Sequence, residues 1–129
     1  MYNTISNILR KEIANAYRWT PTSSNRDFVI SSINSGGIYA YIDTFENKVI
    51  YVGRTDNLDR RLQEHWSDNE PNRMLRNYLH NYQTKVLYKK EDSQTKCAGM
   101  ELYLYKRYQP VCNDRVPDAT EEIAIPLPL

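Results

Sequence analysis

Two short strand-like runs joined by a turn constrain the fold of this chain more than any other feature. Residues 38–42 alternate aliphatic with aromatic side chains, and residues 49–52 consist of β-branched and aromatic side chains alone. Both compositions favour β-strands. Residues 44–48 between them are mostly polar and typical of a turn. The sequence therefore predicts a β-hairpin at the centre of the fold.

Apolar residues at helical spacing predict helices on both sides of this hairpin. Residues 5–17 form the first predicted helix, with Thr4 as its N-cap. Asp56 is placed to cap a second helix, whose inner stripe at every fourth position is Leu58, Leu62 and Trp66. Residues 20–25 are expected to form a loop, and the short apolar run at residues 28–33 fits a strand and a helix segment equally well.

The next elements follow the same rules. Asn69 and Pro71 predict the start of a third helix. Its expected inward side chains are Met74, Leu75, Tyr78, Leu79 and Tyr82. Residues 85–90 fit a third strand, and Ser93 begins a last helix that runs to about Tyr108, just before a proline. A hairpin, two helices, a strand and a helix indicate an α+β fold.

One carboxylate interrupts the apolar stripe of the last helix. The stripe consists of Cys97, Glu101, Leu104 and Tyr108. A buried carboxylate without a partner is costly, so Glu101 requires a cation, a metal ion or a hydrogen-bond network. For an isolated glutamate, a salt bridge to an arginine is the ordinary explanation.

Charge is unevenly distributed along the chain. The net charge of +1 is weaker than expected for a protein that wraps nucleic acid, because phosphate neutralisation dominates such binding. Residues 73–90 nevertheless contain five basic side chains and no Asp or Glu, whereas residues 114–129 contain one Arg and four acidic side chains. The basic stretch is a candidate nucleic-acid surface, although such runs are often solvated faces.

Length and cysteine content set the broad class. A chain of 129 residues fits one compact domain. Residues 1–17 lack the uninterrupted apolar core of a signal peptide or membrane span, so a cytoplasmic location without membrane contact is expected. With Cys97 and Cys112 alone, neither a disulfide framework nor a zinc cluster is expected, and both thiols fit small buried hydrophobes.

The predicted hairpin carries the three-residue motifs Gly37-Ile38-Tyr39 and Tyr51-Val52-Gly53. They are followed in order by Asn57, Leu58, Arg61, His65, Glu101 and Asn113. This pattern resembles the GIY-YIG nuclease family, which is named after the two motifs and includes the excision-repair nuclease UvrC and phage homing endonucleases. Valine replaces the middle isoleucine of the second motif. The resemblance covers residues 36–113.

The resemblance implies a small central three-stranded antiparallel sheet flanked by helices. It divides the chain into a helix-and-loop extension at residues 1–35, a nuclease domain at residues 36–115 and a Pro-containing acidic tail at residues 116–129. The tail is expected to be an extended surface segment or a frayed end. The domain is expected to act as a stand-alone catalytic module, since no separate DNA-binding domain fits the chain.

The resemblance also implies a metal-dependent DNA endonuclease that cuts one strand per active site. Glu101 is the expected ligand of one Mg²⁺ or Mn²⁺ ion, because these cations accept carboxylate oxygen and keep several waters. By the same resemblance, Tyr39 is expected to orient or deprotonate the attacking water, Tyr51 to steady the phosphate or that water, and Arg61 to hold the scissile phosphate. His65, one turn from Arg61 on the same helix face, is a candidate member of the proton relay.

Four residues are assigned to DNA contact, namely Arg54, Asn113, Arg73 and Arg76. Asn113 is expected to brace the site rather than perform a chemical step. The plain alternatives are strand aromatics for the tyrosines and a surface position for the histidine. Two functions of other classes stay open: a nucleic-acid-binding module without chemistry, and a nuclease subunit that needs a protein partner. A homodimer or a restriction enzyme is a variant of the main hypothesis, and the motifs are compatible with repair, restriction and mobile-element functions, including a nucleoid location in bacteria or phage.

Overall fold

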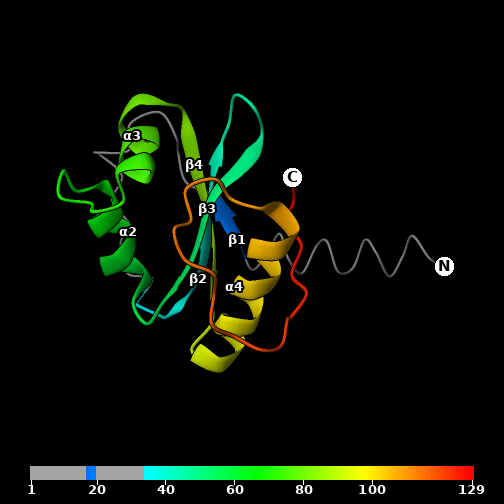
Figure 1. The fold of residues 1–129 in the computed structure, drawn as a ribbon. Coiled ribbons are helices and arrows are strands. Elements are labelled where there is room, and N and C mark those ends of the chain that lie inside the picture. The colour runs from blue at the N-terminus through cyan, green and yellow to red at the C-terminus, as the bar shows by residue number, and fades with distance from the viewer. Residues whose placement is uncertain (1–16, 20–33) are drawn as a thin grey trace.

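An antiparallel sheet organises the molecule (Figure 1). The structure is a computed structural model that describes residues 17–19 and 34–129. Within these ranges the elements are β1 (Tyr17–Trp19), β2 (Gly37–Asp43), β3 (Lys48–Thr55), α2 (Leu58–Trp66), α3 (Arg73–Asn81), β4 (Thr84–Lys90) and α4 (Gln94–Tyr108). The strands lie side by side in the order β1-β4-β2-β3, so β2 is central and β3 lies at an edge.

The predicted α+β fold is confirmed by β2, β3 and β4, which form the expected three-stranded antiparallel sheet with helices against it. The short strand β1 extends this sheet, with Tyr17 opposite Lys89 of β4. The prediction that Tyr17 ends the first helix is therefore wrong, because backbone pairing with a distant strand decides its conformation. The predictions for residues 5–16, 20–25 and 28–33 lie outside the described residues.

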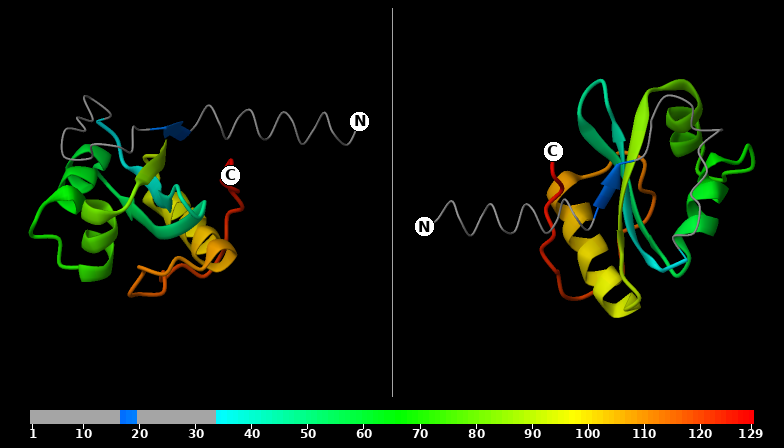
Figure 2. Two further views of the ribbon diagram at one scale, coloured as in Figure 1. Left: turned by 90° about the horizontal axis from the view of Figure 1, so that it is seen from above. Right: turned by 180° about the vertical axis from the view of Figure 1, so that it is seen from behind.

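Alternation along β2 sends two kinds of side chain to opposite faces of the sheet. Ile38, Ala40 and Ile42 belong to a buried cluster with α4, whereas Tyr39 and Tyr41 belong to a second cluster with α2 and α3. Figures 1 and 2 show α4 on one side of the sheet and α2 and α3 on the other. The tyrosines of β2 are thus enclosed between the sheet and α2 and α3.

A β-bulge in β3 decides where Tyr51 points. Tyr41 of β2 pairs with Tyr51, but the next residue of β2 pairs with Val49, so Ile50 is an extra residue. Val49 packs in the α4 cluster, while Ile50 and Tyr51 pack in the cluster under α2 and α3. In a regular strand Val49 and Tyr51 would share a face. The bulge therefore turns Tyr51 toward the tyrosines of β2.

Side-chain caps begin the helices, and two of them differ from the prediction. Ser93 caps α4 as predicted. The N-cap of α2 is Asn57 rather than Asp56, and the N-cap of α3 is Asn72 rather than a start at Asn69 and Pro71. In both cases the asparagine amide oxygen accepts a hydrogen bond from the N–H three residues further on, as is typical of an N-cap.

The inward stripe of α2 is confirmed, and that of α3 is narrower than predicted. Leu58 and Leu62 are buried in the cluster with Tyr41, and Trp66 packs against that cluster. On α3 Leu75 and Leu79 are buried, but Met74 is 49% exposed and Tyr82, which lies beyond the end of α3, is 52% exposed. A helix lying on one sheet face buries the side chains along its contact line, and Met74 and Tyr82 lie off that line.

The basic stretch at residues 73–90 does not form one continuous patch. Its two arginines lie on α3. Along β4, Leu87 packs in the α4 cluster, so alternation places Lys85 and Lys89 on that side of the sheet and Lys90 on the other. The charges that are adjacent in the sequence are therefore divided between opposite faces.

The C-terminal segment packs against α4 instead of fraying. Ile123 N–H donates to the Gly99 carbonyl at 3.0 Å, and Leu127 N–H donates to the Tyr108 hydroxyl at 2.9 Å. Ile125 and Leu127 are buried in the α4 cluster. The segment is extended, as Figure 2 shows, but the prediction of a frayed end is wrong.

The cysteines and the helix lengths bear on the expected class of the protein. Cys97 and Cys112 are buried free thiols, as predicted. Within residues 17–19 and 34–129, no helix is long and apolar enough to cross a membrane.

Candidate active site

Three buried side chains form a hydrogen-bonded row on the tyrosine face of the sheet. Tyr39 Oη lies 2.6 Å from His65 Nε2, and His65 Nδ1 lies 3.0 Å from Glu70 Oε2. All three residues are at most 3% exposed. β2 supplies Tyr39, α2 supplies His65, and the segment between α2 and α3 supplies Glu70. A phenol next to an imidazole that has a carboxylate on its other side can pass its proton to the imidazole. We call Tyr39, His65 and Glu70 the buried relay.

Gly53 makes room for the buried relay. It lies opposite Tyr39 in the pairing of β2 with β3. A Cβ atom at Gly53 would lie 2.5 Å from Tyr39 Oη and 2.6 Å from Tyr39 Cζ, closer than such contacts allow. The phenol ring therefore lies across the backbone of β3, which explains why the second motif ends in glycine.

Two further tyrosines frame the buried relay. The Tyr51 ring stacks on Tyr39 with a centroid distance of 6.2 Å and meets His65 edge-on at 5.3 Å. Tyr41 packs edge-on against Tyr39 at 5.9 Å and against His65 at 5.7 Å. Tyr41 is fully buried, and its hydroxyl has no hydrogen-bond partner in the described part of the chain, whereas Tyr51 is partly exposed. Tyr51 is thus the member of this cluster that faces solvent.

The surroundings of Tyr39 keep its phenol protonated. Burial raises the pKa of Tyr39 well above its ordinary value, and the neighbouring Tyr51 raises it further. The charge and hydrogen bonding of Arg61 oppose this rise without overcoming it. Arg61 itself stays a cation: burial lowers its pKa, but Tyr39, Tyr51 and the carboxylates of Glu70 and Glu64 together bring it above the ordinary value. Tyr39 can therefore take a proton from water only if it passes its own proton to His65.

His65 and Glu70 hold complementary protonation states. Burial lowers the pKa of His65 below its ordinary value, although the hydrogen bond to Glu70 works against this shift. Burial opposes ionisation of Glu70, but the hydrogen bond and charge of His65, the Asn72 N–H and the charge of Arg61 bring its pKa below the ordinary value. A neutral imidazole thus faces an ionised carboxylate near neutral pH.

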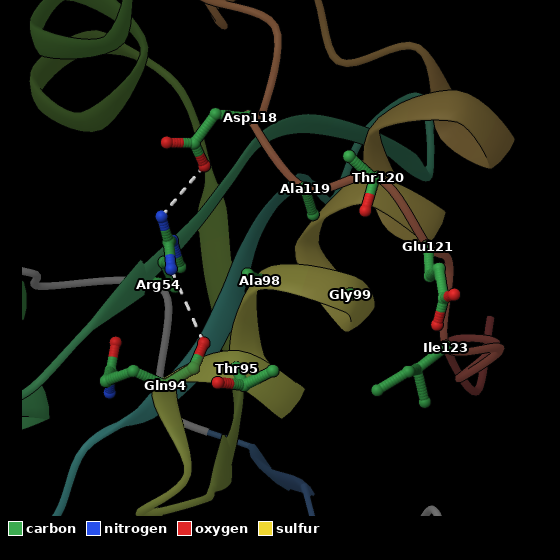
Figure 3. A pocket seen from close by; sticks show the side chains of 10 residues that line it. All are labelled: Arg54, Gln94, Thr95, Ala98, Gly99, Asp118, Ala119, Thr120, Glu121 and Ile123. Atoms are coloured by element: carbon green, nitrogen blue, oxygen red, sulfur yellow. Dashed lines mark hydrogen bonds and ion pairs between the residues drawn. The ribbon is translucent and has the colours of Figure 1, made fainter.

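Glu101 belongs to a second group, on the α4 side of the sheet. Its Oε1 lies 3.4 Å from Arg54 Nε, and its side chain is 14% exposed. Arg54 also contacts Asp118 Oδ1 at 3.0 Å and the Gln94 carbonyl at 3.4 Å (Figure 3). Burial raises the pKa of Glu101 to about 7, with Arg54 lowering it and Asp118 raising it. The carboxylate in the apolar stripe therefore has an arginine neighbour.

The edge strand β3 connects the two groups. It presents Tyr51 and Gly53 to the buried relay, while Arg54, the next residue, reaches Glu101. Burial raises the pKa of Tyr51, the charge of Arg61 lowers it, and the charges of Glu70, Glu101 and Asp114 raise it, so both groups act on this phenol. The structure thus brings Tyr39, Tyr51, Arg61 and His65 together, and places Glu101 with Arg54 across the sheet edge from them.

Glu101 has the chemistry of a ligand for a hard divalent cation. Its pKa shows that burial disfavours the bare carboxylate, so a cation beside it would stabilise the charged form. No set of three or more His, Cys, Asp or Glu side chains in the described ranges is arranged to enclose a metal ion. Mg²⁺ is suited to such a site because it keeps several of its waters and needs few protein ligands.

Asn113 braces the strand that carries Tyr51. Its Oδ1 accepts from the Val52 N–H at 2.9 Å, and its Nδ2 donates to the Val52 carbonyl at 3.0 Å. The neighbouring Cys112 N–H donates to the Ile50 carbonyl at 2.8 Å. The side chain therefore replaces a missing neighbour strand along the edge of β3, in line with the bracing role that the sequence suggests.

Replacing Asn113 by Ala is expected to lower the free energy of unfolding by about 1–3 kcal/mol, because the Val52 N–H and carbonyl lose both partners. Chemical denaturation followed by tryptophan fluorescence measures this change. The matched control is Asn77→Ala, since Asn77 is exposed and accepts one hydrogen bond from Asn81. Its expected effect is within about 0.5 kcal/mol, as for ordinary surface positions. Equal effects of the two variants would contradict the bracing role.

The arginines of α3 lie apart from the buried relay. Arg73 is exposed in the first turn of α3, and Arg76 Nη1 donates to the Asp68 carbonyl at 3.3 Å. Neither arginine belongs to the buried relay, and their contact with DNA stays a prediction.

Glu70 is the member of the buried relay that the sequence did not reveal. It lies five residues after His65, between two helices, next to a proline and just before the start of α3. An acidic residue at this place is explained equally well by a favourable interaction with the helix dipole. Only the folded arrangement, in which the chain turns back at Ser67 to Glu70, shows that it contacts His65.

Comparison with known proteins agrees with the motifs and the fold. The family model of the GIY-YIG catalytic domain matches residues 35–115. The UvrABC system protein C of Dictyoglomus thermophilum is 31% identical over 84 residues, which are 65% of this chain. The chain matches 13% of the length of that relative. The protein belongs to the GIY-YIG catalytic domain family, a nuclease family.

Proposed function

We propose that this protein is a divalent-metal-dependent endonuclease that hydrolyses phosphodiester bonds of DNA. The observation that supports this most strongly is the 2.6 Å contact between Tyr39 Oη and His65 Nε2 beside Arg61, since it offers a buried phenol a route to give up its proton. Family membership and the partial likeness to UvrABC system protein C support the same proposal. The catalytic unit in this proposal is residues 36–115.

The proposed reaction begins with a water molecule held at the Tyr39 hydroxyl. As the water oxygen attacks phosphorus, its proton passes to Tyr39 Oη and the Tyr39 proton passes to His65 Nε2. The bond from phosphorus to the leaving oxygen breaks, and that oxygen keeps the bonding electron pair and takes a proton from solvent. His65 then releases its proton to solvent through Tyr39, which restores the starting state. Proton transfer of this kind contributes about 100- to 10,000-fold in rate when the acceptor is well placed.

Arg61 and Tyr51 act on the phosphate in this proposal. The Arg61 guanidinium stays charged and offers two parallel N–H groups to the phosphoryl oxygens, where negative charge gathers during attack. Tyr51 is the partly exposed tyrosine of the cluster and can donate a hydrogen bond to the same oxygens. Arg54, Arg73 and Arg76 bind flanking phosphates, which Arg54 can do if its contact with Asp118 opens.

Glu101 holds the metal ion in this proposal, and Mg²⁺ or Mn²⁺ suits its single carboxylate. The bound ion supplies charge stabilisation to the phosphoryl and leaving oxygens. Arg54 lies 3.4 Å from the Glu101 carboxylate and therefore competes with the ion for it. One carboxylate implies one ion per active site.

The direct test is DNA cleavage by the purified protein with Mg²⁺ or Mn²⁺ on supercoiled plasmid, branched DNA and single-stranded DNA. Cleavage is expected with metal and is expected to stop on chelation. Glu101→Gln is expected to lower the rate by about 1,000-fold, the scale of losing a group that stabilises transition-state charge. Its affinity for Mn²⁺, measured by calorimetry, should fall in parallel. No cleavage of any DNA form with either metal would refute the proposal.

The same assay separates the alternatives. Salt-dependent DNA binding without cleavage indicates a binding module, and cleavage that appears only with an added protein indicates a partner-dependent subunit. Paired breaks at fixed positions indicate a dimeric, sequence-specific enzyme.

A further inference from the structure

We propose that Glu70 is a positioning residue that sets the tautomer of His65, so that the Nε2 lone pair of His65 is aimed at the Tyr39 hydroxyl. This inference rests on the proposed function for its catalytic meaning, because it concerns how the proton leaves Tyr39. Its structural content, which nitrogen of His65 carries the proton, can be tested independently.

The geometry carries the inference. Glu70 Oε2 lies 3.0 Å from His65 Nδ1, and both side chains are at most 2% exposed. An ionised carboxylate only accepts hydrogen bonds, so His65 Nδ1 must carry a proton. In a neutral imidazole the other nitrogen is then an acceptor. At 2.6 Å from Tyr39 Oη, that nitrogen accepts the phenol hydrogen.

Glu70 is itself held in place from the other side. Its Oε1 accepts from the Asn72 N–H at 3.2 Å, and its own N–H donates to the Ser67 carbonyl at 3.2 Å. Asn72 in turn caps α3 and donates to the Cys112 carbonyl at 2.7 Å. The carboxylate is therefore fixed to the start of α3, so the position of that helix orients the imidazole.

The carboxylate also stabilises the product of proton transfer. When His65 accepts the Tyr39 proton it becomes a buried cation, and Glu70 is the anion that contacts it directly. The other groups facing His65 are Tyr39 and Tyr41 from β2, Tyr51 from β3, and Arg61 and Glu64 from α2. Arg61 disfavours the cation, whereas Glu70 and Glu64 favour it.

Two variants that each remove one negative charge distinguish the positioning of His65 by Glu70 from a general electrostatic effect on His65. Glu70→Gln keeps the shape but removes the charge at Nδ1, and its amide can donate to Nδ1 and force the proton onto Nε2. Glu64→Gln removes one charge on α2 next to His65, at a position 46% exposed that pairs with Arg60 at 3.4 Å. We expect Glu70→Gln to lower kcat for DNA cleavage by about 100-fold. Glu64→Gln should stay within about 3-fold of the wild type, as is expected of an exposed ion pair.

The pH dependence of kcat distinguishes the two roles, because it would not change if Glu70 were purely structural. His65 must be neutral to accept the proton, so kcat falls on the acid side as His65 becomes protonated. Glu70 raises the pKa of His65, so its neutralisation lowers that pKa. In Glu70→Gln the acid limb is therefore expected to shift to lower pH while the plateau rate drops. Glu64→Gln removes a weaker interaction with His65, so its acid limb should shift less. A limb and a plateau in Glu70→Gln that change no more than those of Glu64→Gln would overturn the proposal.

Nitrogen NMR tests the tautomer even if no DNA is cleaved. The chain has two histidines, and a His80→Gln variant assigns their signals. The wild-type protein is expected to show His65 protonated at Nδ1 near neutral pH. Protonation at Nε2 would overturn the inference whatever the cleavage assay shows. Failure of the wild type to cleave DNA, with the Nδ1 tautomer present, would refute the proposed function alone. If Glu70→Gln does not fold, the spectrum of the wild-type protein still shows which nitrogen of His65 carries the proton.

Discussion

Replacing Tyr39 by Phe is expected to lower the rate of DNA cleavage by about 100- to 10,000-fold. The substitution removes only the hydroxyl that lies 2.6 Å from His65 Nε2 and leaves the buried ring in place. Without that oxygen the attacking water has no path to His65. The loss of one buried hydrogen bond is expected to cost about 1–3 kcal/mol of stability, so the fold persists. Single-turnover cleavage with Mn²⁺ measures the rate.

Tyr41→Phe is the matched control for Tyr39→Phe. Tyr41 lies two residues away on the same face of β2 and is equally buried, but its hydroxyl has no hydrogen-bond partner among the described residues. Removing an unsatisfied buried hydroxyl is expected to leave cleavage unchanged and to raise stability by about 1 kcal/mol. Equal rate losses in the two variants would show that the tyrosine cluster acts only through packing.

Gly53→Ala is expected to abolish most activity through one methyl group. Its Cβ would lie 2.5 Å from Tyr39 Oη, and the ring cannot move away without leaving His65. Gly53 does not have a positive φ, so alanine is compatible with its backbone and the effect isolates the clash. We expect a stability loss of about 1–3 kcal/mol, as for other overpacked cores. We also expect cleavage to fall by about 100-fold, as when a proton-transfer group is misplaced.

Gly99→Ala is the matched control for Gly53→Ala. Its Cβ would meet Ile123 Cγ1 at 2.8 Å and the Glu121 carbonyl oxygen at 3.0 Å, so the C-terminal segment must shift while the contact of Tyr39 with His65 is not involved. We expect a stability loss of about 1–3 kcal/mol from this overpacking, partly offset by the helical preference for alanine of about 1 kcal/mol. Cleavage by Gly99→Ala should nevertheless match the wild type, because the clash lies on the α4 side of the sheet. Wild-type activity in Gly53→Ala would contradict the placement of Tyr39 in the proton path.

Local patterns predicted the elements better than their boundaries. Alternating side chains identified β2, and the serine and proline that flank α4 identified its extent, since both features act over a few residues. The caps of α2 and α3 were misplaced because several neighbouring Asp, Asn and Pro residues satisfy the same rule. Which of them caps the helix depends on how the helix packs, and the actual caps are Asn57 and Asn72.

Some features of the candidate site could likewise be predicted from the sequence, and others could not. Tyr39, Arg61, His65 and Glu101 are recognisable along the chain because their order and spacing resemble the family's motifs, and helix periodicity adds support for Arg61, His65 and Glu101. Three other features could not be predicted from the sequence, because neither strand alternation nor helix periodicity indicates them. They are the bulge at Ile50, the contact of Glu70 with His65 and the ion pair of Arg54 with Asp118.

Residue order alone was sufficient for the α+β class, because strand alternation and helical spacing follow from backbone geometry. It was also sufficient for the motif residues, because their order and spacing resemble those of the GIY-YIG family. The tertiary structure decided which protonation states those residues hold. Burial between the sheet and α2 keeps Tyr39 a phenol and His65 neutral, and the loop before α3 supplies the carboxylate that faces the imidazole. Desolvation and hydrogen-bond partners arise only when distant segments pack together, which is why the proton path became visible in the fold.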